Sequence, residues 1–299
     1  MNKILGLLGG NRAADAFRKT VSGDPSGAPD WSHHMAIGND AGFFGPGSAV
    51  WEVHGCIGTL VGGIRALLMQ AAHPAALTGV AEHSAYDTDP LGRLERTTRW
   101  LTITSFGSTE AIAQEARRVR EMHSRVTGQF ETKSGAHAAY SASDPRYLLW
   151  VHCAFTDSFL RAHKELGYSL PQGDDAYVRE WARSAQPLGL QQAPTSTVDL
   201  AATLASFATN EVASIAMTPP IVGFILKPPF GKTGMIFYRI LANAAISTID
   251  EPFLSVLGLK KRSKIWLKIS RTLLDSLSYM LGHESPSQRI ARQRIDALQ

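Results

Sequence analysis

Apolar side chains recur at steps of three and four along most of the chain, which is the spacing of one face of an α-helix. No convincing series of alternating apolar and polar residues, as strands would need, interrupts this pattern. Stretches rich in Gly, Pro, Ser and Asp separate the periodic segments, among them the stretch ETKSGAHAAYSASDP. The pattern predicts an all-α fold, a single compact multi-helix domain of roughly ten helices or more.

The segment SFGSTEAIAQEARRVREMHSRVTG predicts a capped amphipathic helix. Ser108 is a good N-cap, and Glu110 suits the positive end of the helix dipole. One face carries Ile112, Ala116, Val119, His123 and Val126, and the opposite face carries Gln114, Glu115, Arg118, Arg120 and Glu121. His123 is therefore expected to face the core. A buried imidazole needs a partner, which is either a metal ion or a backbone carbonyl.

The segment DPRYLLWVHCAFTDSFLRAHKELG repeats this situation. Asp144 is the expected N-cap and Pro145 the first helical residue. His152 lies on one stripe with Leu148, Phe155 and Phe159. Two core-facing histidines in successive helices could share a cofactor, or one could hydrogen-bond the surroundings of the other. Structural roles for both stay open at this point.

A third predicted helix begins near Asp89 and Pro90. Its residues Arg93, Arg96, Thr97 and Trp100 lie three and four positions apart and share a face. Such a face is either solvated or the lining of a pocket, in which arginines would pair with carboxylates and Thr97 would hydrogen-bond a distal ligand or water. Upstream, His73 precedes Pro74, where an imidazole either marks a helix end or is aimed into a cavity.

Together these segments carry a resemblance. The run LLMQAAHPAALTGVAEHS, then DP-x-x-R-x-x-R-T, then FGS with VREMHSRVTG, then YSASDPRYLLWVH resembles the MpaB-like oxygenase and rubber oxygenase (latex clearing protein) catalytic-domain family, over about residues 45 to 185. Members of that family are all-helical, and several bind a b-type haem. The resemblance implies a haem b-dependent oxygenase with a buried haem pocket, dioxygen as co-substrate and an apolar, isoprenoid or lipid-like substrate.

The resemblance also assigns roles to residues. His123 corresponds to the proximal iron ligand. The pocket motif of rubber-cleaving members resembles Arg-x-x-Lys-Thr, whereas this chain has Arg93-Leu-Glu-Arg96-Thr97. A guanidinium is a poor iron ligand, so we expect a distal site that holds water or is open. We assign catalytic roles to Arg93, Arg96 and Thr97, and expect the apolar cavity to surround Trp100, Phe106 and Phe155. Cofactor contacts are assigned to His123, Arg93, Arg96, His152 and Trp100.

Composition restricts the partners of the protein. The formal net charge is +4, and the positive excess is concentrated after residue 251. The stretch KKRSKIWLKISRTLLDSLSYML predicts a basic amphipathic helix with Ile265, Ile269, Leu273 and Leu277 along one side. That helix either packs its apolar side on the domain or rests on anionic lipid, a peripheral membrane contact. No nucleic-acid-binding motif accompanies the basic run, so nucleic acid is not an expected partner.

Other features point to a cytoplasmic protein. Cys56 and Cys153 both lie in apolar surroundings, as reduced core thiols do, and no zinc-ligand spacing is present. The apolar N-terminal run is too short for a secretory signal. We expect residues 1–45 to be an N-terminal extension, 46–285 the catalytic domain and 286–299 a C-terminal tail. The alternatives to an oxygenase are a haem-binding sensor or carrier without turnover, or a metal-free helical protein with structural histidines.

Overall fold

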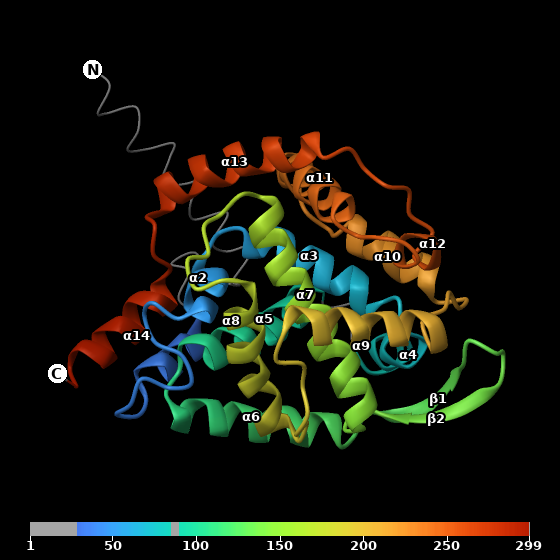
Figure 1. Cartoon of the computed structure of the whole chain (residues 1–299), viewed down its shortest axis with the longest axis horizontal. Helices are drawn as coiled ribbons and strands as arrows, with labels where there is room; N and C mark the ends of the chain where they lie inside the picture. The colour runs from blue at the N-terminus through green and yellow to red at the C-terminus, as the bar shows by residue number, and fades with distance from the viewer. Residues whose placement is uncertain (1–28, 85–89, 299) are drawn as a thin grey trace.

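The computed structural model describes residues 29–84 and 90–298, without the side chains of residues 90–94 and 233. Most of the described chain is helical, which confirms the predicted fold class (Figure 1). The elements in chain order are η1 Asp30–Ala36, α2 Ala49–Gly55, α3 Thr59–Gln70, α4 Pro74–His83, α5 Pro90–Phe106, α6 Thr109–His123, β1 Thr127–Glu131, β2 His137–Ser141, α7 Pro145–Glu165, α8 Asp174–Trp181, η2 Ala182–Leu188, α9 Thr197–Asn210, α10 Thr218–Leu226, α11 Lys232–Ser247, α12 Phe253–Val256, α13 Ile265–Leu281 and α14 Pro286–Asp296.

Helix α7 crosses the middle of the molecule and packs along α3, and α11 packs against α3 and α13 (Figure 1). The close approach of α3 and α7 requires a glycine. A Cβ atom at Gly62 would lie 2.7 Å from Cδ1 and 3.2 Å from Cα of Phe159. Beside this contact Arg65, only 2% exposed, pairs with Asp157 at 2.7 Å and donates to Ser158 Oγ at 2.8 Å. The pair compensates the desolvation of a buried guanidinium.

The helix starts that the sequence indicated are confirmed. Ser108 caps α6 by accepting a hydrogen bond from Ala111 N, and Asp144 caps α7 by accepting one from Arg146 N. Pro145 occupies the first turn of α7. Pro90 is the first residue of α5, whereas Asp89 lies outside the described residues.

A β-hairpin was missed. Residues 127–141 form two antiparallel strands, with Thr127 opposite Ser141. Most of this hairpin lies in the stretch at residues 131–145 that we expected to be a loop, whereas Thr127 and Gly128 lie in the segment that predicted a helix. Each strand buries one aromatic residue, Phe130 or Tyr140, and exposes its neighbours. Strands of five residues give an alternation too short to stand out from a polar loop.

A polar network in the core fixes the protonation of His54 on α2. Its Nδ1 lies 2.7 Å from Ser105 Oγ, and its Nε2 lies 2.9 Å from the hydroxyl of Tyr177. Ser105 Oγ itself donates to Leu101 O at 2.6 Å, so it accepts from Nδ1–H, and Tyr177 donates to Nε2. The ring packs on Trp181 with centroids 4.3 Å apart. Burial lowers the pKa of His54 to about 3, which keeps the imidazole neutral.

We predict that His54→Phe makes the free energy of unfolding depend less steeply on pH under acidic conditions. The folded-state pKa of His54 is lowered, so the unfolded chain takes up a proton that the fold excludes, and wild-type stability falls as the pH drops below about 6.5. Urea unfolding between about pH 5.5 and 4 measures this slope, which should be less steep in the variant by roughly 1.4 kcal/mol per pH unit. An unchanged slope would contradict a neutral His54.

Candidate functional site

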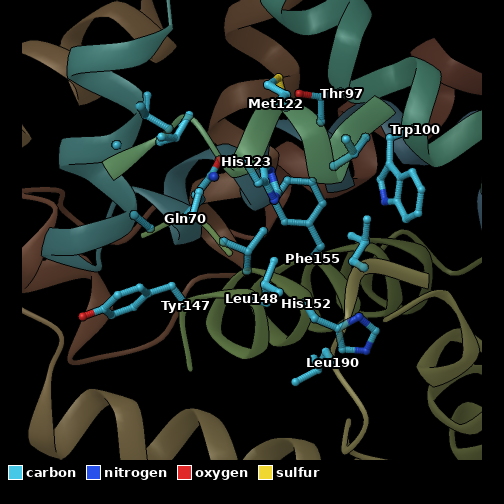
Figure 2. Close-up of a pocket in the computed structure, with 18 of the residues that line it drawn as sticks. Gln70, Thr97, Trp100, Met122, His123, Tyr147, Leu148, His152, Phe155 and Leu190 are labelled. Atoms are coloured by element: carbon cyan, nitrogen blue, oxygen red, sulfur yellow. The ribbon is translucent and has the colours of Figure 1, made fainter. Parts of the chain in front are cut away.

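A cavity of about 310 Å³ lies between α4, α5, α6, α7 and η2, with the hairpin at one side (Figure 2). Carbon atoms supply most of its wall. The polar groups come from a few histidine, tyrosine, serine, threonine, glutamine and arginine side chains, and no carboxylate of the described residues lines it. A largely apolar cavity with few polar groups is typical of small-molecule sites.

Three of the predicted helix faces converge on this cavity. Arg96, Thr97 and Trp100 line it from α5, His123 from α6 and His152 from α7. Figure 2 shows His123 projecting into the middle of the group, with Thr97 and Trp100 on one side and His152 beside Leu190 on the other. The cavity therefore brings together residues up to 56 positions apart in the sequence, each on a helix face that the helical spacing predicted. The side chain of Arg93 lies outside the described part of α5, and the roles of all six residues stay predictions.

His123 is the last residue of α6 and is half-buried. Burial, with a smaller contribution from the nearby Arg118 cation, lowers its pKa below the usual value of 6.5. Its imidazole is therefore neutral near pH 7, the form in which a ring nitrogen binds a metal. No group of the described residues makes a hydrogen bond to this ring, so both nitrogens are available to a ligand.

A buried carboxylate joins the two helices that carry Thr97 and His123. Glu115 of α6 is 1% exposed, although its place in the sequence pattern predicted the solvent-facing side. Its Oε2 accepts from Arg99 Nε of α5 at 2.9 Å, and its Oε1 accepts from Arg118 Nη2 at 2.5 Å. Arg118, also expected to face solvent, lines the cavity instead. Sequence reasoning missed Glu115 because its partner Arg99 belongs to another helix, and it missed Arg118 because Arg118 pairs with that buried carboxylate.

The electrostatics of the cavity follow from this arrangement. Arg96 and Arg118 line the cavity, while the single charge of Glu115 is shared between Arg99 and Arg118. The cavity therefore has guanidinium groups beside a large apolar wall. An amphipathic ligand with acidic groups matches this distribution of charge.

One other prediction about the site is wrong, and for His73 one of the two alternatives is confirmed. Phe106 does not line the cavity, because it packs on Trp51 with centroids 4.9 Å apart in a separate cluster of buried residues. His73 marks a helix end: its Nδ1 accepts from Ala75 N at 3.2 Å, and its Nε2 lies 3.3 Å from Glu211 Oε2. Its ring is therefore engaged outside the cavity.

The hairpin is held against the cavity by two hydrogen bonds. His83 Nε2, at the end of α4, lies 3.0 Å from Thr127 O of β1. Tyr140 of β2 donates to Glu82 Oε2 at 2.8 Å. Both His83 and Tyr140 line the cavity, so the missed hairpin contributes part of its wall.

Within the described residues, no three His, Cys, Asp or Glu side chains come together as a set that could hold a metal ion. A family model described as "ER-bound oxygenase mpaB/B'/Rubber oxygenase, catalytic domain" matches residues 51–275. This range contains every residue of the cavity wall. No curated protein and no solved structure matches the chain.

We predict that Glu115→Gln destabilises the protein by about 2 kcal/mol. Loss of one partner of a buried ion pair costs about 3–5 kcal/mol, but Arg99 and Arg118 are 25% and 33% exposed, so water compensates part of the loss. The free energy of unfolding in urea measures the change. Glu121→Gln, exposed on the same helix, is the matched control and should change it by less than about 0.5 kcal/mol. Equal effects of the two substitutions would show that Glu115 does not join α5 to α6.

Proposed function

Since the chain belongs to the MpaB and rubber oxygenase catalytic-domain family and is an oxygenase, we propose that it binds haem b in the cavity through His123 and acts on an apolar, isoprenoid or lipid-like substrate. The observation that carries this proposal is the imidazole of His123, which lines the cavity with no hydrogen-bond partner among the described residues. When bound, the haem supplies a redox-active iron that reacts with dioxygen.

The residues present fit a haem in three respects. A porphyrin provides four of the iron's ligands, so one neutral protein nitrogen completes the attachment, and the lowered pKa of His123 provides it. The apolar wall formed by side chains such as Val119, Leu148 and Phe155 suits a flat hydrophobic ring system. Arg96 and Arg118 provide cations for the two propionates.

The remaining side chains have roles that follow from their chemistry. A guanidinium has no lone pair to offer iron, so Arg96 is assigned to an anion and not to the metal. Glu115 holds Arg118 in one orientation, which lowers the entropic cost of binding an acidic group. Thr97 provides a hydroxyl that donates or accepts a hydrogen bond inside the cavity, and the apolar side chains exclude bulk water. Arg93 remains a candidate through the resemblance alone.

We predict that His123→Ala abolishes stoichiometric haem binding, whereas His152→Ala weakens it less. The first substitution removes the proposed iron ligand, and the second alters only the wall of the cavity. Haem content per chain and the Soret band, with its shift on reduction and with carbon monoxide, measure the effect. His83→Ala is the matched control, since His83 also lines the cavity but its Nε2 is bonded to Thr127 O.

A larger loss of haem in His152→Ala than in His123→Ala would show that His123 is not the iron ligand. A colourless wild-type protein that takes up no added haemin would contradict the haem proposal altogether. Conversion of a lipid or polyisoprene by the haem-loaded protein and dioxygen distinguishes turnover from haem binding alone.

We also propose a peripheral contact with anionic lipid through α13. The helix packs on the domain through Leu267, Ser270, Leu274 and Leu277. Ile265 and Ile269, which the sequence placed on one stripe with Leu277, are instead 51% and 41% exposed. They share the outer side with Tyr279 and Met280, at 81% and 57% exposed, and with the exposed cation Lys268. Exposed apolar groups beside cations are typical of a helix that lies on a membrane surface. No helix of the described chain is both long and apolar enough to span a bilayer.

We predict that Lys268→Gln weakens binding to vesicles that contain phosphatidylserine by about fivefold, since one cation near an anionic surface contributes about 1 kcal/mol. Co-sedimentation at several salt concentrations measures the affinity. Arg117→Gln, exposed on α6 at the opposite edge of the molecule, is the control and should have no effect (Figure 1). Binding that does not depend on anionic lipid or on Lys268 would exclude this contact.

A further inference from the structure

His152 places an unusual polar group in the apolar part of the cavity. Its ring lines the cavity beside Leu190 (Figure 2). Its Nε2 is completely covered and has no hydrogen-bond partner among the described residues. Nδ1 is not among these covered atoms, and no hydrogen bond of the described residues reaches it. Nδ1 is therefore the nitrogen that is open to the cavity.

The surroundings of His152 leave it without a local partner. Leu148 and Phe155 lie one helical turn away on α7, and Trp181 and Leu190 contribute further apolar surface. The hydroxyl of Ser184, which also lines the cavity, donates to Trp181 O at 2.7 Å and is engaged there. An imidazole in such a place costs free energy unless a ligand satisfies it.

The covered nitrogen determines which tautomer is present. A buried N–H without an acceptor is rarer and more costly than a buried lone pair without a donor, so the proton belongs on Nδ1 rather than Nε2. Burial lowers the pKa of His152 to about 4, which keeps the ring neutral near pH 7. The ring thus presents one neutral N–H donor to the cavity.

We propose that Nδ1–H of His152 donates a hydrogen bond to an oxygen atom of the substrate, so that the substrate is an apolar molecule with a carbonyl or hydroxyl group and not a plain hydrocarbon. This inference rests on the proposed function, since it names the substrate class of the same cavity. A neutral acceptor suits this donor, because an anion in the apolar surroundings of His152 would lose its hydration without gaining a countercharge. Acidic groups are better placed near the guanidinium groups of Arg96 and Arg118, which also line the cavity.

The two classes of ligand differ in what they do to this donor. A hydrocarbon displaces water from the cavity and leaves Nδ1–H unpaired, whereas a ketone of the same length replaces the lost hydrogen bond. A site that hydrogen-bonds a substrate oxygen strongly rejects an analogue that lacks this oxygen. An apolar pocket discriminates less strongly against a ligand that carries an additional methylene or hydroxyl group. We therefore expect wild-type protein to bind an isoprenoid ketone about 10- to 100-fold more tightly than the matching hydrocarbon.

The test measures the dissociation constants of an isoprenoid methyl ketone and of the hydrocarbon of equal length by equilibrium dialysis against the protein as purified. Quenching of tryptophan emission is a second readout, because Trp100 and Trp181 line the cavity. His152→Phe keeps a ring and removes the donor, so the preference for the ketone should disappear. His152→Gln retains an N–H donor and should keep part of the preference. His152→Leu replaces the Phe variant if that variant does not fold.

Equal binding of the two compounds to the wild type, or a preference that survives in His152→Phe and His152→Leu, would overturn this assignment. Haem content is measured on the same preparations, so that failure of the His152 proposal can be distinguished from failure of the haem proposal. Haem-loaded protein without a ketone preference contradicts the role of His152 alone. Protein that takes up no added haemin but still shows the His152-dependent preference contradicts the haem proposal and supports the donor.

Discussion

The cavity depends on one buried ion pair network, in which the Glu115 carboxylate accepts hydrogen bonds from Arg99 and Arg118. A carboxylate with 1% of its surface exposed is stable only if its partners stay in place, so the network fixes α5 against α6. The positions of Thr97 on α5 and of His123 on α6 follow from that register. The same network orients Arg118 along the cavity wall, so one interaction determines both the shape of the site and its charge.

Helical periodicity was enough to predict which side chains meet in the cavity. His123 and His152 each lie on an apolar stripe, and the two stripes face the same space because their helices pack around one core. Periodicity failed where a charged residue found its partner on another helix. Nothing in the sequence around Glu115 distinguishes it from an exposed glutamate such as Glu121, because burial is decided by the position of Arg99 in space. A sequence pattern predicts the usual exposure of a residue type, and a buried charge with a partner on another helix departs from that usual exposure.

The other failures have similar causes. Phe106 is the last residue of α5 and packs on Trp51, because η1, α2 and α14 contribute to a second cluster of buried residues at that end of the helix. The hairpin at residues 127–141 is stabilised by tertiary contacts, namely Tyr140 with Glu82 and His83 with Thr127, rather than by strong strand propensity. Ile265 and Ile269 were placed on one side of the helix with Leu277, either packed on the domain or in contact with lipid, but α13 packs on the domain through Leu267, Ser270, Leu274 and Leu277 and leaves both isoleucines exposed. In each case the outcome depends on contacts with residues distant in the sequence.

The two histidines of the cavity differ in their surroundings, and this difference argues for two roles rather than a shared one. His123 lies near the cation Arg118, so its side of the cavity attracts acidic groups and disfavours a protonated imidazole. His152 is surrounded by apolar side chains, and desolvation alone keeps it neutral. A ligand with acidic groups gains free energy only on the first side, whereas a neutral acceptor is satisfied on the second. The two proposals therefore assign the imidazoles different partners, an acidic cofactor for His123 and a neutral, mostly apolar substrate for His152.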